Sequence, residues 1–280
     1  MTFDVERLGN SGQTIAAARA EGRSALVAYL PVGFPDLQTS IDAMVAVSEG
    51  SDGRGADFVE IGMPYSDPVM DGSAIQYATN KALQAGTRTR DLFTAVEQLA
   101  TRGNAPTLMI YWNLVERYGV TRFARDLASA GGAGLITPDL TPDEADEWIS
   151  AAEENGLDRI FLVAPNSTDE RLKITVSACR GWVYATSVLG VTGARQQTSK
   201  AAPMIVQRTK DADPTIPVGV GLGVSNGQQA AEVASYADAV IVGSALVMQL
   251  IDIEQGRQAG LDGLRRLASE LAAGVRGEAK

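Results

Sequence analysis

Three carboxyl groups stand close together in and after a short apolar segment of the chain. Glu60 lies inside the apolar run 57–62, and Asp67 and Asp71 follow in a loop rich in proline and glycine. Such a run predicts a buried parallel strand, where an unpaired ionised carboxylate is costly. A carboxyl group kept there is a candidate general acid or base. The alternative is a structural glutamate paired with an arginine or lysine. The two aspartates that follow favour the catalytic interpretation, because α/β enzymes build active sites at the carboxyl ends of strands.

Strand periodicity predicts the direction in which the Glu60 side chain points. Side chains alternate along a strand, so Phe58, Glu60 and Gly62 share one face, while Val59 and Ile61 share the other. If helices cover one face, Glu60 points toward the interior of the sheet or barrel.

The complete absence of histidine excludes several kinds of catalytic and metal site. A Ser-His-Asp triad, a His–Cys pair and a histidine-ligated metal are excluded, so acid–base work falls on carboxylates, Tyr, Lys or Cys. The single cysteine, Cys179, cannot form an intrachain disulfide, which fits a reducing cytoplasm, and we expect it to be a small buried hydrophobe. The acidic segment 1–6 lacks the apolar core of a signal peptide, and no run is long enough to span a bilayer. We therefore expect a cytoplasmic protein.

Length and composition fit one large α/β domain covering residues 1–280. The chain has 280 residues, of which 45% are hydrophobic and 21% charged, enough for a substantial core. Its net charge of −10 argues against nucleic acid or an anionic membrane as the main partner.

Strand-like runs alternate with segments of helical period along the whole chain. The predicted strands are residues 25–30, 57–62, 107–111, 134–137, 159–163, 182–186, 217–220 and 239–242. About eight β-then-α units predict a (β/α)₈ TIM barrel. An open doubly wound sheet is the alternative, since periodicity does not distinguish the two. Segment 2–19 has helical spacing and predicts an extra N-terminal helix that caps the bottom of the barrel.

Several helix starts carry capping residues. Thr141 is followed by Pro142 and two acidic residues, and residues 167–170 and 225–227 are further cap-like starts. Residues 51–55 predict a polar turn before the second strand.

Glycine-rich loops follow the last three predicted strands. The run 217–223 ends at Gly223, the run 239–242 leads into Gly243 and Ser244, and a third loop, 190–193, follows the sixth strand. Glycine lets backbone N–H groups approach an anion, and a helix N-terminus offers unpaired donors. The sequence therefore predicts a phosphate site. A dinucleotide fingerprint is the weaker alternative, because the run lies in the wrong half of the chain and lacks the final glycine.

These motifs, in this order, resemble the family of tryptophan synthase α subunits over residues 25 to 251. The stretches that carry the resemblance are 33–36, 59–72, 111–113, Tyr184 with 190–193, 221–223 and 243–244. The resemblance implies a barrel that cleaves indole-3-glycerol phosphate to indole and glyceraldehyde 3-phosphate. It also implies an α2β2 heterotetramer with a β subunit that holds pyridoxal phosphate and consumes the indole, and neither a cofactor nor a metal in this chain.

The resemblance also assigns the two catalytic roles. Glu60 is implied to be the acid/base at C3 of the indole and at the glycerol side, and Asp71 to accept from the indole N–H. A glutamate with a reference pKa of about 4.3 would cost about 3.7 kcal/mol to protonate at neutral pH, so burial should raise its pKa.

The remaining site residues follow by resemblance. The phosphate is expected at Gly193, Gly223, Gly243 and Ser244, and the indole slot at Tyr29, Leu222 and residues near Met109. Tyr184 is expected in the pocket near Glu60, with an ordinary core aromatic as the alternative. Thr192 is expected to bond Asp71 when the loops close, and Asp67 to communicate between loops.

The chain departs from the family pattern at three places. Phe34 stands where many members have Asp, Leu222 stands where an aromatic is frequent, and residues 51–55 look like an insertion. Three other functions stay open: another phosphosugar isomerase or aldolase, a free-standing indole-releasing lyase, and a non-catalytic activating subunit. A Schiff-base aldolase would need a lysine at a strand end, and the predicted strands contain none.

Overall fold

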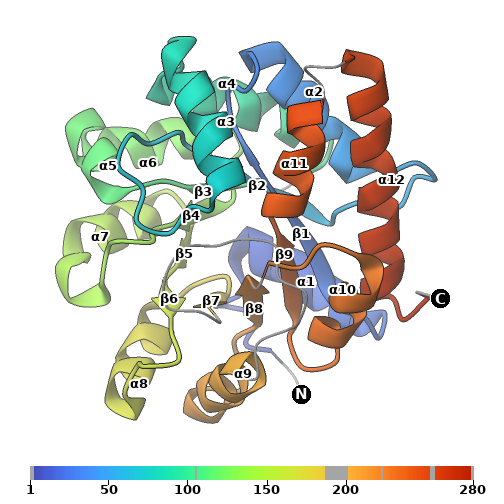
Figure 1. The fold of residues 1–280 in the computed structure, drawn as a ribbon. Helices are drawn as coiled ribbons and strands as arrows, with labels where there is room; N and C mark the ends of the chain where they lie inside the picture. The colour runs from blue at the N-terminus through green and yellow to red at the C-terminus, as the bar shows by residue number, and fades with distance from the viewer. Residues whose placement is uncertain (1–2, 105, 187–200, 222, 253–255, 279–280) are drawn as a thin grey trace.

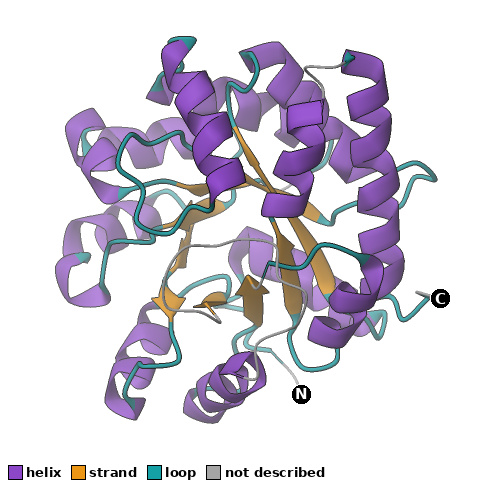
Figure 2. Cartoon of the chain, viewed as in Figure 1, coloured by secondary structure: helices purple, strands orange, loops and turns teal. Residues whose placement is uncertain are grey.

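Nine parallel strands form one continuous sheet, surrounded by helices (Figures 1 and 2). The structure is a computed structural model, and it describes residues 3–104, 106–186, 201–221, 223–252 and 256–278. The strands are β1 Ala25–Pro31, β2 Phe58–Gly62, β3 Thr107–Met109, β4 Gly134–Ile136, β5 Asp158–Ile160, β6 Leu162–Val163, β7 Val183–Thr186, β8 Val218–Gly221 and β9 Ala239–Val242.

The sheet closes into a barrel. Its strand order is β5-β4-β3-β2-β1-β9-β8-β7-β6, and only Phe161 separates the two end strands along the chain. The Phe161 carbonyl accepts from the Tyr184 amide at 3.1 Å, so the break itself is bonded to β7. The TIM barrel prediction is confirmed and the open-sheet alternative is wrong. The predicted fifth strand is divided in two at Phe161.

Apart from the first helix, which lies across one end of the barrel, the helices surround this ring of strands (Figure 2). Within the described residues they are α1 Gly9–Ala20, α2 Leu37–Glu49, α3 Ser73–Gln84, α4 Thr89–Ala100, α5 Trp112–Tyr118, α6 Val120–Ser129, α7 Asp146–Glu154, α8 Asp169–Ala178, α9 Ala201–Ala212, α10 Gly227–Ala234, α11 Ser244–Asp252 and α12 Arg257–Val275, with a 3₁₀ turn at Pro142–Glu144. None of these helices is both long and apolar enough to cross a lipid bilayer.

Two of the three predicted helix starts are confirmed. The Thr168 side chain accepts from the Arg171 amide at the start of α8, and the Asn226 side chain accepts from the Gln229 amide at the start of α10. The start at Thr141 is wrong in detail, because its side chain forms no cap and the segment begins as a 3₁₀ turn before α7.

Strand alternation divides the buried side chains into two clusters. The larger cluster packs between the strands and the surrounding helices. The smaller one fills the barrel interior and includes Val27, Phe58, Ile160, Trp182 and Ile241. Since Phe58 belongs to the interior cluster, Glu60 also points inward, two residues farther along β2.

The extra helix closes one end of the barrel. Ile15 and Ala18 of α1 pack into the interior cluster. Asp158, at the start of β5, accepts from the Asn10 amide at 3.2 Å, the Ser11 amide at 2.8 Å and the Ser11 hydroxyl at 2.6 Å. This carboxylate therefore caps α1 from the barrel wall. The predicted helix is confirmed, but it begins at Gly9.

Residues 51–55 dock on the last helix. Ser269 of α12 donates its hydroxyl to Asp52 at 2.8 Å and accepts from the Ser51 amide at 2.9 Å. Arg54 pairs with Glu278 at 3.0 Å. These contacts tie the turn before β2 to α12 and the segment that follows it.

Shortening Ile15 should destabilise the closed end of the barrel. Ile15 is fully buried, so Ile15→Ala removes packed methylenes and leaves a cavity, and we expect a loss of about 2–4 kcal/mol in the free energy of unfolding by urea. Ile174→Ala is the matched control, because Ile174 is 39% exposed on α8 and should cost less than about 1 kcal/mol. Equal losses in the two variants would contradict a packed interior plug.

Candidate functional site

Glu60 is the central group of the site. Its side chain is fully buried on β2, and neither carboxyl oxygen has a hydrogen-bond partner within the described part of the chain. Burial raises the pKa of this carboxyl group to about 8. No ion pair joins it to an arginine or lysine among the described residues, so the paired structural glutamate is wrong. The structure instead holds a carboxylic acid that keeps its proton at neutral pH.

Two tyrosines flank Glu60 inside the barrel. Tyr29 on β1 is its register partner, and a Cβ built on Gly62 would stand 2.3 Å from the Tyr29 hydroxyl. A Cβ built on Gly221 would stand 2.4 Å from the Tyr184 hydroxyl. Burial raises the pKa of both tyrosines well above the ordinary value, and the Glu60 charge adds to the rise in each. The two glycines therefore make room for two neutral hydroxyl groups near the acid, one of them that of Tyr184.

Asp71 lies in the loop 63–72 between β2 and α3. Its backbone carbonyl accepts from Gln76 Nε2 at 2.8 Å, and burial raises the pKa of its carboxyl group to about 6. The Asp71 and Glu60 charges both act on Tyr29, so the structure brings the three groups together. Asp67 is exposed and accepts from the neighbouring Ser66 hydroxyl at 2.6 Å, away from this cluster.

The glycine-rich strand ends differ in what they can offer an anion. Gly223 has a left-handed φ of +73°. The first turn of α10 that follows is already bonded, because Asn226 accepts from the Gln229 amide and Glu270 from the Gly227 amide at 2.9 Å. α11, in contrast, begins at the buried Ser244, directly after β9 and Gly243, and helix starts leave N–H groups without intrahelical partners. Leu222, Thr192 and Gly193 lie outside the described residues.

The predictions missed Tyr111 as a site residue. Its hydroxyl accepts from the Val69 amide at 3.0 Å, and its ring stacks on Tyr65 with centroids 4.3 Å apart. The sequence signal was an aromatic residue placed just after a strand, at the end where the site lies.

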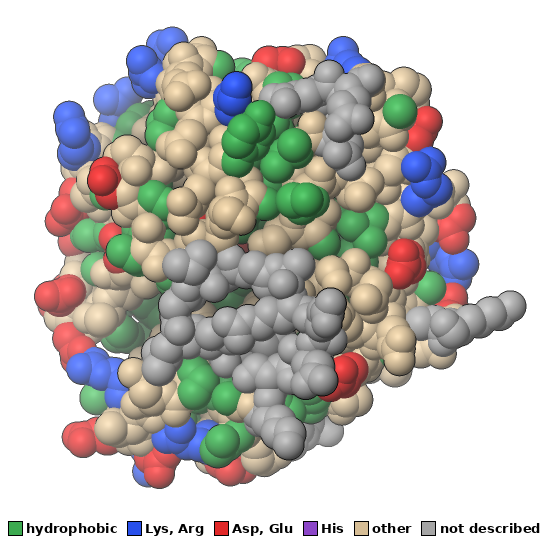
Figure 3. All heavy atoms as spheres, in the orientation of Figure 1, with side chains coloured by type: hydrophobic (Ala, Val, Ile, Leu, Met, Phe, Trp, Pro, Cys, Tyr) green, Lys and Arg blue, Asp and Glu red, His purple; other side chains and the backbone are tan. Residues whose placement is uncertain are grey.

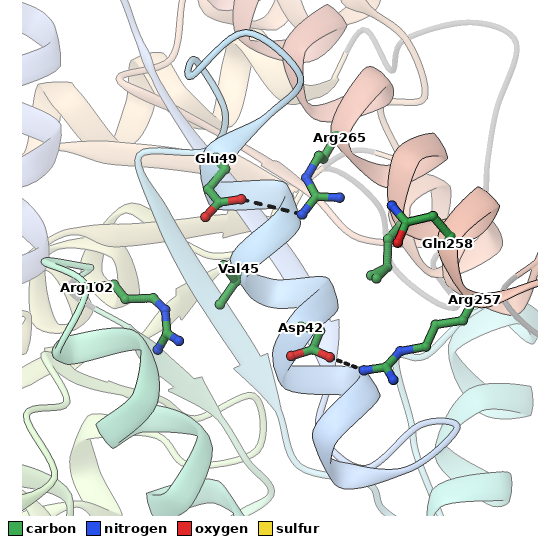
Figure 4. A pocket seen from close by; sticks show the side chains of 8 residues that line it. Asp42, Val45, Glu49, Arg102, Arg257, Gln258 and Arg265 are labelled. Atoms are coloured by element: carbon green, nitrogen blue, oxygen red, sulfur yellow. Dashed lines mark hydrogen bonds and ion pairs between the residues drawn. The ribbon is translucent and has the colours of Figure 1, made fainter.

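A groove of about 430 Å³ lies elsewhere, in the outer helix layer between α2 and α12 (Figure 4). Its charged side chains are largely paired, Arg257 with Asp42 and Arg265 with Glu49. It contains none of the predicted site residues. Within the described part of the chain, no group of three acidic or cysteine side chains could hold a metal ion.

The face seen in Figure 3 carries most of its charged side chains toward the edge, while apolar side chains gather over α3 and α11. The exposed apolar side chains of these helices and of the loop 63–72 are Val69, Tyr77 and Met248.

The sequence model of the family described as tryptophan synthase alpha chain matches residues 15–276. The chain belongs to this family. The family's protein from Mycobacterium marinum is 56% identical over 276 residues, which cover 99% of this chain and 98% of that protein. The one from Nocardia farcinica is 56% identical over 270 residues, which cover 96% of each.

Solved structures of the family superpose on the whole barrel. Mycobacterium tuberculosis tryptophan synthase gives a TM-score of 0.89 at 55% identity and covers 96% of this chain and 98% of that chain. The tryptophan synthase complex from Pyrococcus furiosus gives a TM-score of 0.80 at 32% identity and covers 89% of this chain and 98% of that chain. Membership of this family argues against another phosphosugar isomerase or aldolase.

Buried Glu60 should make stability fall as the pH rises. The folded state holds the Glu60 proton up to about pH 8, whereas the unfolded chain releases it near 4.5. The unfolding free energy of the wild type, relative to Glu60→Gln, should therefore fall between these two values by at most roughly 1.4 kcal/mol per pH unit. Urea unfolding from pH 5 to 8 measures it. Glu97→Gln, at an exposed position, is the control for a Glu-to-Gln substitution outside the site. Parallel curves for Glu60→Gln would refute the raised pKa.

The contact between Gly221 and Tyr184 can be tested by compensation. Gly221→Ala places a Cβ 2.4 Å from the Tyr184 hydroxyl and 3.0 Å from its nearest ring carbons, so it should cost about 1–3 kcal/mol of stability. Adding Tyr184→Phe removes the closest atom and should restore at least half of that loss, a coupling measured by a double-mutant cycle of unfolding free energies. Additive losses would show that the two residues do not touch.

Proposed function

We propose that this chain is the lyase subunit of a tryptophan synthase and cleaves indole-3-glycerol phosphate to indole and glyceraldehyde 3-phosphate. One observation carries the proposal: Glu60 is a buried, unpaired carboxylic acid inside the barrel, with a second carboxyl group, Asp71, in the loop that follows its strand. Family membership supports the same activity.

The pKa values separate the two carboxyl groups into two roles. Between about 6 for Asp71 and about 8 for Glu60, Asp71 is ionised while Glu60 holds its proton. Such a pair provides one acid and one base at neutral pH. No histidine is needed for either role.

A retro-aldol cleavage uses both the protonated Glu60 and the ionised Asp71. Glu60 gives its proton to C3 of the indole ring, which leaves positive charge at the indole nitrogen. Ionised Asp71 accepts from the N–H and stabilises that charge. The Glu60 carboxylate then takes the proton from the hydroxyl on the glycerol carbon that is bonded to C3. The bond between that carbon and C3 breaks at the same time. The products are indole and an aldehyde, and Glu60 ends with the proton with which it began.

The phosphate and the indole ring occupy the remaining predicted positions. In our proposal Gly223, Gly243 and Ser244 face the phosphate, with the N-terminus of α11 as the principal donor and Gly193 as a further contact. The indole ring lies against Tyr29 and Tyr184, with Leu222 and the half-buried Met109 completing the slot. Thr192 bonds Asp71 when the site closes.

The proposed partner is a tryptophan synthase β subunit. A tryptophan synthase from Pyrococcus furiosus forms an a2b2 complex, and a chain of the same family takes the corresponding place in an α2β2 heterotetramer. Pyridoxal phosphate is expected in the β subunit, with no cofactor in this chain. We also propose that residues 1–280 act as a single domain and that the reaction takes place in the cytoplasm.

Indole release from indole-3-glycerol phosphate tests this function. The purified chain, with and without a tryptophan synthase β subunit, is compared with Glu60→Gln and Asp71→Asn. We expect turnover that rises with the β subunit and falls by roughly 10²–10⁴-fold in Glu60→Gln, because the amide cannot transfer a proton. Glu97→Gln is the control for an unrelated glutamate and should retain full turnover.

The outcomes separate the remaining alternatives. Turnover unaffected by the β subunit would indicate a free-standing lyase. No turnover in either setting, with retained activation of the β reaction, would indicate a non-catalytic subunit.

A further inference from the structure

Tyr111 contacts the Asp71 loop at two separate points. Near the start of the loop, the Tyr65 ring stacks on Tyr111 with centroids 4.3 Å apart and planes inclined by 21°. Farther along, the Val69 amide donates to the Tyr111 hydroxyl at 3.0 Å. Tyr111 therefore contacts the loop on both sides of its exposed tip, where Ser66 and Asp67 lie.

Tyr111 itself is firmly placed. It is 6% exposed and is the residue before α5. The next amide, that of Trp112, donates to the Asp139 carboxylate at 2.9 and 3.2 Å, which joins it to the segment after β4. Two residues earlier, the Met109 carbonyl accepts from the Met63 amide at 2.9 Å. Tyr111 thus lies between two residues whose backbone bonds join the carboxyl ends of β2, β3 and β4.

Asp71 lies within electrostatic reach of this hydroxyl. Burial raises the pKa of Tyr111, the Asp71 charge adds to the rise, and the amide donors of Val69 and Met70 oppose it. At neutral pH the hydroxyl is therefore a neutral acceptor, and it bonds to the backbone two residues before that carboxylate.

We propose that Tyr111 is a positioning residue that sets the place of the Asp71 carboxylate by clamping the loop 63–72 between its ring and its hydroxyl. The inference rests on the proposed function. In the proposed reaction Asp71 must meet the indole nitrogen in one geometry, and a small misplacement of a reacting group lowers the rate strongly. Loss of the clamp thus acts on turnover more than on substrate binding, which depends chiefly on the phosphate loops.

The test compares Tyr111→Phe, which removes the hydroxyl and keeps the ring, with Tyr65→Leu, which removes the stacking partner. Tyr118→Phe is the matched control, because the Tyr118 hydroxyl also has a partner, Asp126 at 2.7 Å, but on α6. Each variant is measured in complex with the β subunit for kcat and KM. Amide hydrogen exchange of residues 66–71 is measured in the same complexes.

We expect Tyr111→Phe to lower kcat about tenfold with KM changed less than about threefold, and to speed exchange of the Val69 amide at least tenfold. Tyr65→Leu should also lower kcat and speed exchange, but less than Tyr111→Phe. The loss of kcat in the double variant should be smaller than the product of the two single losses, because both substitutions remove the same clamp. Tyr118→Phe should leave all three quantities unchanged.

Three results would overturn the proposal. One is unchanged exchange in Tyr111→Phe, which would show that the hydroxyl does not hold the loop. Another is faster exchange with full kcat, which would show that loop placement does not matter for Asp71. The third is a loss confined to KM, which would make Tyr111 a substrate contact. If the wild type shows no turnover, the proposed function fails, while the exchange data still decide whether the clamp exists.

Discussion

Glu60 has no hydrogen-bonding or ionic partner among the described residues, and much of the surrounding barrel is arranged about this unpaired group. An isolated ionised carboxylate is costly in an apolar interior, so the fold keeps the acid protonated. Gly62 lies on the same strand as Glu60 and Gly221 lies on β8, and the space beside these glycines is filled by Tyr29 and Tyr184. The desolvation that makes the acid useful is therefore a property of the whole barrel rather than of a local partner.

One end of the barrel stabilises the fold, and the other carries the candidate site. At one end α1 packs Ile15 into the interior and Asp158 caps the helix, so this end serves stability. At the other end, the carboxyl ends of the strands carry the loop with Asp71 and the glycines before α10 and α11. This division between a stabilising and a functional face is common to barrels of this type. It also lets the loops differ between relatives without disturbing the core.

Local periodicity predicted most of the fold, because strand alternation and capping residues act over a few positions. It predicted every strand segment and the inward direction of Glu60. The division at Phe161 was not predictable, since it depends on how two edges of a curved sheet meet. Tyr111 was missed as a site residue for a related reason: its partners Tyr65 and Val69 are more than 40 positions away along the chain, and only the closed barrel brings them together.

The titration of this molecule in the neutral range is unusually simple. The chain has no histidine, and burial moves the pKa of its one thiol, Cys179, to about 12. Within the described residues, burial raises the pKa of Glu60 to about 8 and those of Asp71 and Asp158 to about 6. Since Glu60 and Asp71 belong to the site, part of the proton uptake or release on ligand binding reports on the site itself. Calorimetry in buffers of different ionisation enthalpy would count these protons without any label.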